Sequence, residues 1–206
     1  MTELQIITAA GGGAFLLNLV ITPLLIKLSH YHGWYDRTDH RTIHDGDIPR
    51  IGGIGIFLSG TILFFAVLVL DGEHVTAGAP VQRFWTVALG SVLAIHLIGI
   101  LDDFTHLKAR YKLIVQLLIA AVVVLSGFSF QHLYVPFFQS VISLGWFAPV
   151  LTFVWIVGIS NAVNLIDGLD GLSGTLSAVA LGLLGIYALT QGNLGLTLAA
   201  VSVFGA

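Results

Sequence analysis

The sequence predicts an all-α protein, a polytopic bundle of transmembrane helices that forms one integral membrane domain over residues 1–206. Of the 206 residues, 56% are hydrophobic and 9% are charged, whereas soluble domains carry about 25% charged residues. The mean hydropathy is +0.96. Six apolar runs are long enough to cross a bilayer, and a seventh reaches the end of the sequence. The absence of cysteine excludes disulfides and thiolate metal sites.

The expected helices follow from the apolar runs, since a span needs about 20 predominantly apolar residues. The first run has no basic residues before it and is too long for a signal peptide, so it is read as a retained first helix. The fourth is short and needs flanking residues to span. The predicted spans are residues 4–28, 51–70, 84–101, 111–125, 147–165 and 173–190, with the seventh, cut off at 206, starting near residue 194.

The basic residues set the expected topology, because Lys and Arg concentrate in cytoplasmic loops. Seven of the eight lie in or beside the first and third connections, which are on one side of an alternating arrangement. That side is predicted to be cytoplasmic, with the N-terminus outside. The seven are Lys27, Arg37, Arg41, Arg50, Lys108, Arg110 and Lys112, and Arg83 is alone in the second connection.

An aromatic segment in the fourth connection is expected outside. From Phe128 to Pro136, apolar and aromatic residues occupy alternate positions. Alternation of this kind indicates extended chain. The sequence therefore predicts a short extracytoplasmic hairpin around residues 128–138, at the level of the lipid headgroups.

The stretch 161–172 is the most polar part of the later spans. Asn161, Asn164, Asp167 and Asp170 recur at every third position. A carboxylate at the centre of a membrane helix costs roughly 2.5–3.5 kcal/mol on insertion scales. Glycines at 168 and 171 permit a break in the helix here. The predicted break would turn all four polar side chains toward one cavity on the cytoplasmic face.

Asp102 and Asp103 form a second acidic cluster, at the expected end of the third span. Adjacent carboxylates at a helix C-terminus repel each other and oppose the helix dipole. One interpretation is structural: Asp103 caps the fourth helix and Asp102 is solvated. The other is a paired-carboxylate site that serves a cation or a proton transfer. Lys112, in the first turn of the fourth helix, suits phosphate.

The first connection is rich in His, Arg, Asp and Gly, and a solvated loop is the plain interpretation of most of it. The spacing of its four histidines is weak evidence for a metal site. Pro49 suits a helix start, and Gly52 and Gly53 permit close approach of a helix or a phosphate. Acids and carboxamides suit Mg²⁺, whereas basic residues suit phosphate. Together they indicate chemistry on a phosphate borne by a lipid.

These motifs resemble, in order and spacing, the polyprenyl-phosphate N-acetylhexosamine-1-phosphate transferases of glycosyltransferase family 4. The run Ile-Pro-Arg-Ile-Gly-Gly at 48–53 is similar to the branch that transfers N-acetylglucosamine-1-phosphate to undecaprenyl phosphate. That branch serves O-antigen, enterobacterial common antigen, lipopolysaccharide and teichoic acid synthesis. The motifs are residues 41–44, 48–53, 101–103, 109–116 and 161–172.

The resemblance implies a reaction between a UDP-N-acetylhexosamine and undecaprenyl phosphate. It releases UMP, uses Mg²⁺ with Mn²⁺ as the alternative, and occurs at the cytoplasmic face of the bacterial inner membrane. Membrane lipids are expected partners and nucleic acid is not. A homodimer is one option for the assembly of the protein. The implied catalytic residues are Asp102, Asp103, Asp167 and Asp170, the substrate-binding residues Lys112, His44, Arg50, Asn161 and Asp170, and the metal ligands Asn164 and Asp103.

Family members have about ten helices, with a further metal-binding aspartate and a His-rich sugar-recognition motif in later loops. Neither is found in this sequence, so the expectation is an N-terminal part of such a transferase whose activity alone is doubtful. The phospho-MurNAc-pentapeptide transferases are the alternative within the family. A secondary transporter and an inactive truncated membrane protein are the alternatives of other classes.

Overall fold

The computed structural model describes residues 2–35, 49, 51–76, 81–105, 107–166 and 171–206. The chain forms two compact units, Met1–Ala79 with Asp167–Ala206, and Pro80–Ile166. The described residues confirm an almost entirely helical fold. The helices are α1 (Glu3–His32), α2 (Gly52–Thr76), α3 (Val81–Thr105), α4 (Ala109–Leu125), α5 (Ala148–Ile166), α6 (Leu172–Thr190) and α7 (Leu194–Gly205).

Local sequence explains both ends of the first helix. Thr2 caps α1 in a capping box with Gln5, which satisfies backbone N–H groups that lack helical partners. Gly33 ends the helix at φ 69°, a left-handed conformation that glycine adopts without strain. The helix therefore extends beyond the apolar run 4–28 at both ends.

In the first unit, α7 packs against α1, α2 and α6. Its side chains Thr197, Leu198 and Ser202 are no more than 1% exposed, and on α1 Ala10 and Ala14 are fully buried. Membrane helices have no hydrophobic driving force for association in lipid, so they depend on close packing. Small residues at the contact permit that close approach. A Cβ atom at Gly11 of α1 would lie 2.7 Å from Val201 of α7, so this contact depends on glycine.

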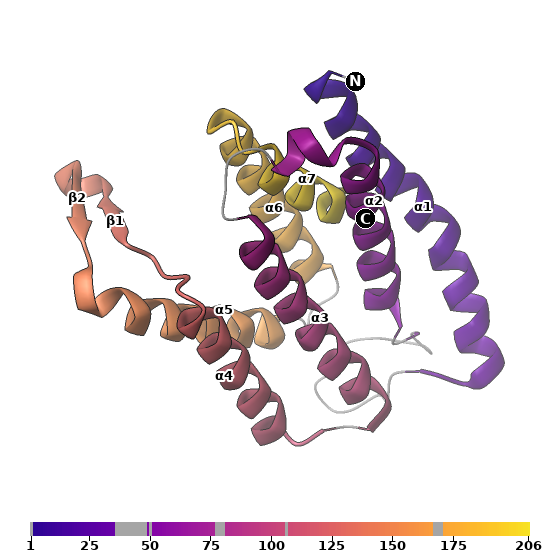
Figure 1. Ribbon diagram of the computed structural model, residues 1–206. Helices are drawn as coiled ribbons and strands as arrows, with labels where there is room; N and C mark the ends of the chain where they lie inside the picture. Colours follow the sequence, from indigo (N-terminus) through magenta and orange to yellow (C-terminus); the bar gives the residue numbers. More distant parts are fainter. Residues whose placement is uncertain (1, 36–48, 50, 77–80, 106, 167–170) are drawn as a thin grey trace. The chain divides into compact units, whose positions relative to one another are not determined.

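In the second unit, α4 packs against both α3 and α5 (Figure 1). The rings of Phe84 and Phe128, 5.5 Å apart, join α3 to the chain just after α4. At the other end of α4, Lys112 reaches Asp102 of α3. These two contacts make α3 and α4 an antiparallel pair.

A β-hairpin projects from the junction between α4 and α5 (Figure 1). Strand β1 (His132–Val135) pairs antiparallel with β2 (Ser140–Ser143) around the 3₁₀ turn η1 (Pro136–Phe138). A second 3₁₀ turn, η2 (Gly145–Phe147), leads into α5. The predicted hairpin is thus present, but it begins and ends further along the chain than 128–138.

Five helices of the described chain are long and apolar enough to cross a membrane, by length and composition: α1, α2, α3, α5 and α6. The two remaining helices, α4 and α7, have 17 and 12 residues. The polytopic helical fold is therefore confirmed. The number of spans, the outside N-terminus and the single domain stay predictions.

Candidate functional site

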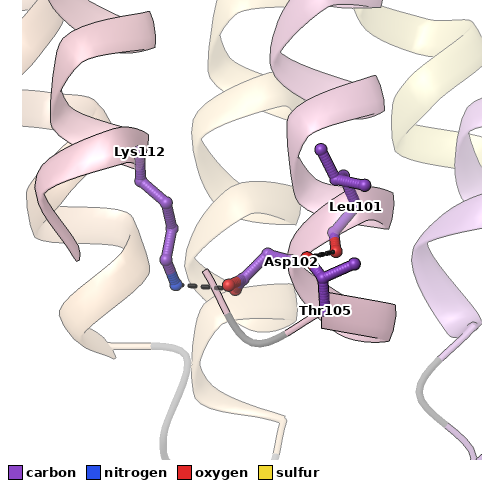
Figure 2. Close-up of polar contacts among 4 residues, drawn as sticks. All are labelled: Leu101, Asp102, Thr105 and Lys112. Atoms are coloured by element: carbon purple, nitrogen blue, oxygen red, sulfur yellow. Dashed lines mark hydrogen bonds and ion pairs between the residues drawn. The ribbon is translucent and has the colours of Figure 1, made fainter. Parts of the chain in front are cut away.

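The end of α3 and the start of α4 bring opposite charges together. Lys112, the fourth residue of α4, donates from Nζ to Asp102 Oδ2 at 2.6 Å (Figure 2). The two side chains are only 28% and 25% exposed. A hydrogen bond between two charged groups is stronger than a neutral one. The cation that adjacent carboxylates need is therefore supplied by α4.

The structural interpretation of the acidic pair is wrong. Asp103 lies inside α3, two residues before its end, and the N-cap of α4 is Lys108. Lys108 makes no side-chain capping bond. Asp102 is not simply solvated, since it holds Lys112. Asp103 itself is partly buried.

Positive charge concentrates at the start of α4. Lys108, Arg110 and Lys112 lie within or next to its first turn, where the backbone N–H groups also carry partial positive charge. The Arg110 guanidinium lies over the Tyr111 ring, 4.9 Å from its centroid. This end of α4 thus has the electrostatic character that phosphate groups prefer.

Helix α5 contacts α4, one turn after Lys112, through a pair of carboxamide side chains. Asn161 of α5 donates from Nδ2 to Gln116 Oε1 of α4 at 2.8 Å, and to the Val157 carbonyl at 2.9 Å. Gln116 lies one turn after Lys112, on the same face of α4. Asn164 lies one turn after Asn161 on α5 and is exposed.

The predicted helix break within 161–172 is confirmed. Helix α5 ends at Ile166 and α6 begins at Leu172, with Gly171 at φ 71° as its N-cap. Four of the predicted site residues lie outside the described residues, so their places stay predictions. They are His44, Arg50, Asp167 and Asp170.

The described residues fit a magnesium ion in donor type. Asp103 and Asn164, the predicted ligands, supply the carboxylate and amide oxygens that Mg²⁺ accepts. Within the described part of the chain no three His, Cys, Asp or Glu side chains cluster to hold a metal. This is compatible with Mg²⁺, which binds through one or two protein carboxylates plus waters and substrate phosphates.

Comparison with known protein families decides the class of the chain. The profile of the family described as Glycosyl transferase family 4 matches residues 85–206, more than half of the sequence. The chain belongs to glycosyl transferase family 4. This match covers the acidic pair, the start of α4 and the α5–α6 break, so the expected family is confirmed. The family and the apolar helices make the chain a multi-pass membrane protein.

Two relatives differ in the transferred group that their names state. The chain is 35% identical over 180 residues to a probable undecaprenyl-phosphate N-acetylglucosaminyl 1-phosphate transferase of Bacillus subtilis (strain 168). It is 34% identical over 204 residues to a phospho-N-acetylmuramoyl-pentapeptide-transferase of Lactobacillus helveticus. The alignments cover 87% and 92% of this chain. They cover 48% and 61% of the relatives, so the chain spans about half the length of these relatives.

Gln116 is the site residue to which the sequence assigned no role. It stands within the 109–116 motif, four residues after Lys112. That spacing places it on the lysine's face of α4, which was the available signal. Its partner, 45 residues further along the chain, became evident only with the packing of α4 against α5.

Proposed function

We propose that the protein containing this chain transfers N-acetylglucosamine-1-phosphate from UDP-N-acetylglucosamine to undecaprenyl phosphate and releases UMP. The observation that carries the proposal is the ion pair between Asp102 and Lys112, made by the two helix ends that bear the family's acidic and basic motifs. The name of the Bacillus subtilis relative supports this transferred group and this acceptor. Such a reaction initiates the synthesis of a cell-envelope polysaccharide.

The transfer exchanges one phosphorus–oxygen bond for another. An oxygen of the lipid phosphate attacks the phosphorus that bears the sugar, and the bond from that phosphorus to the bridging oxygen breaks. The electron pair leaves with UMP. Because the lipid phosphate is already a competent nucleophile, direct attack needs positioning and charge neutralisation more than a covalent enzyme intermediate.

Lys112 is assigned to phosphate binding. An ammonium has three N–H donors, and the bond to Asp102 uses one of them. Asp102 thus holds the ammonium at the start of α4, where Lys108 and Arg110 add positive charge. In this role Asp102 also lies next to the lipid phosphate, whose approach the lysine favours.

Asp103 and Asn164 would hold Mg²⁺, with Mn²⁺ as the alternative ion. The bound metal would neutralise charge on the diphosphate as the phosphoryl group is transferred. Asp167 and Asp170 are assigned to ordering the site, and His44 and Arg50 to the nucleotide-sugar. The basic residues near the site support a position on the cytoplasmic face of the bacterial inner membrane, by the positive-inside rule.

The test is UMP release by the full-length protein in detergent or proteoliposomes. Release is expected to require undecaprenyl phosphate, UDP-N-acetylglucosamine and Mg²⁺. Replacement of Asp102 by Asn keeps the side-chain volume and removes the charge that holds Lys112. We expect release to fall by about 100-fold, the scale of misplacing a group that must be positioned at the reacting centre. Wild-type release by Asp102→Asn would contradict the role of Asp102, and turnover without divalent metal would contradict the role of Mg²⁺.

A second donor is the competing substrate within the family. The Lactobacillus helveticus relative is named for transfer of phospho-N-acetylmuramoyl-pentapeptide. The run at 48–53 favours the smaller UDP-N-acetylhexosamine. Supplying each UDP-sugar separately decides between the two, and UMP release with only the muramoyl-pentapeptide donor would overturn the proposed substrate.

A further inference from the structure

The carboxamide pair of Gln116 and Asn161 is a polar contact between helices that are otherwise apolar. Asn161 Nδ2 donates to Gln116 Oε1 at 2.8 Å and to the Val157 carbonyl at 2.9 Å, and both side chains are partly buried. Both N–H bonds of the Asn161 amide are therefore used within the protein. A hydrogen bond between the side chains of two membrane helices stabilises their association by about 0.6–2 kcal/mol. It contributes little stability beyond what apolar packing gives, but it fixes one register.

That register sets the position of Lys112 on α4 relative to Asn164 on α5. Phe130, just after α4, donates its backbone N–H to Thr152 near the start of α5, and Gln116 meets Asn161 further along. The two contacts make α4 and α5 antiparallel. Moving one turn back along α4 leads to Lys112, and moving one turn forward along α5 leads to Asn164. Both steps go in the same direction, away from the hairpin.

We propose that Gln116 and Asn161 form a clamp that positions Lys112 relative to Asn164. Both are positioning residues: Asn161 holds α5 in register and does not donate to the substrate. This reassigns the residue that the sequence motif placed among substrate-binding groups. The inference rests on the proposed function, in which Lys112 binds phosphate and Asn164 ligates Mg²⁺.

Kinetics of the full-length protein test the clamp. Gln116→Ala and Asn161→Ala are each expected to lower kcat for UMP release about 10- to 100-fold, the scale of a small misplacement of reacting groups. KM for the UDP-sugar is expected to stay within about threefold, because the nucleotide loses no contact. The Mg²⁺ concentration for half-maximal activity is expected to rise in both variants. The kcat of the double variant is expected to be no lower than that of the less active single variant, since either change breaks the same hydrogen bond.

Rescue provides the discriminating comparison. The exchange variant Gln116→Asn with Asn161→Gln keeps the same total number of side-chain atoms and both carboxamides. It is expected to recover at least about a third of wild-type kcat. Gln131→Ala is the matched control: it removes an exposed hydrogen bond to Ser129, just before the hairpin, and is expected to keep wild-type kinetics. A large rise in KM for Asn161→Ala alone, with Gln116→Ala unchanged, would overturn the clamp in favour of direct substrate contact.

Hydrogen exchange measures the clamp without turnover. Amides of residues 162–166 are expected to exchange about tenfold faster in either single variant and no faster still in the double variant. Independent, additive increases, or none, overturn the clamp even if the enzyme is active. If the wild-type protein releases no UMP with either donor, the proposed function fails. The exchange result then still decides whether the two carboxamides act as a unit.

Discussion

At the scale of single residues, the pairing of Asp102 with Lys112 turns an unfavourable sequence feature into an ordered one. Two adjacent aspartates near the C-terminus of α3 face an unfavourable helix dipole. The Lys112 ammonium, 2.6 Å from Asp102, offsets that cost. The same bond restrains a long, flexible side chain that would otherwise lose conformational entropy on binding phosphate. The aspartate thus preorganises the lysine.

Replacement of Lys112 by Met retains most of the apolar stem and removes the charge. We expect UMP release to fall by about 100-fold or more, because the developing charge on the phosphates loses a cation. Lys108→Met is the matched control: it also removes one positive charge near the start of α4, but from an exposed residue without a capping bond. Its effect is expected to stay within about tenfold. Equal losses in both variants would show that bulk charge, and not the ion pair, matters.

The sequence predicted the acidic pair and Lys112 as site residues but left the nature of their contact open. Two interpretations of Asp103 were compatible with its position, because a helix boundary shifted by a few residues would have made it a cap. Extension of α3 to Thr105 removed that option. Gln116 and Asn161 could not be paired from the sequence, since their contact depends on how α4 and α5 pack.

At the scale of elements, Thr152 ties the hairpin segment to α5. Its Oγ1 accepts from the Phe130 backbone N–H at 2.8 Å and donates to the Ala148 carbonyl at 2.8 Å. The side chain is 4% exposed. Phe130 also packs its ring against Trp155, with centroids 6.2 Å apart. The alternation from Phe128 to Pro136 was therefore misleading at its start, because Phe128 and Phe130 pack on helices and do not enter the strand pairing.

Thr152→Val is expected to destabilise the protein by about 1–2 kcal/mol, the cost of leaving the Phe130 N–H without an acceptor in a partly buried place. Valine has nearly the same shape, so packing changes little. Thermal unfolding in detergent measures the effect as a lower midpoint. Thr190→Val is the control, since Thr190 donates to the Tyr187 carbonyl at an exposed position and its loss should cost less than about 0.5 kcal/mol. An unchanged midpoint for Thr152→Val would contradict the role of this hydroxyl.

Helix packing in the first unit depends on glycines that face other helices. Gly11 and Gly12 are neighbours on α1 with different surroundings. A Cβ at Gly11 would lie 2.7 Å from Val201 Cγ1, whereas a Cβ at Gly12 meets nothing within 4 Å. Val201 belongs to α7, whose buried side chains form much of this unit's core.

Gly11→Leu is therefore expected to destabilise the protein by about 1–3 kcal/mol, because overpacking forces α1 and α7 apart. Gly12→Leu gains the same helix propensity and adds only exposed apolar surface, so it is expected to be neutral or stabilising. Comparing their thermal midpoints in detergent cancels the propensity term. Equal midpoints would show that the contact between α1 and α7 is not close in the protein.

At the scale of the whole molecule, hydropathy predicted each α-helix in the described part of the chain and underestimated most of their lengths. The run 84–101 marks only the apolar centre of α3, which continues to Thr105. Helical hydrogen bonds extend into polar flanks that a hydropathy window ignores. Helix partners were not predictable, because apolar surfaces that face lipid and those that face another helix have similar composition.

The orientation across the membrane rests on the basic residues and can be tested directly, since the chain has no cysteine. Lys108 precedes α4 and Phe137 lies at the tip of the hairpin that follows it, 89% exposed. With 17 residues, α4 is about 25 Å long at 1.5 Å per residue, close to the thickness of the hydrocarbon core. The two positions should therefore lie on opposite sides of the membrane.

A membrane-impermeant maleimide is expected to label Phe137→Cys in intact spheroplasts and Lys108→Cys only after permeabilisation. Labelling of Lys108→Cys in intact spheroplasts would show the opposite topology. The ion pair of Asp102 and Lys112 would then lie on the side without cytoplasmic UDP-sugars.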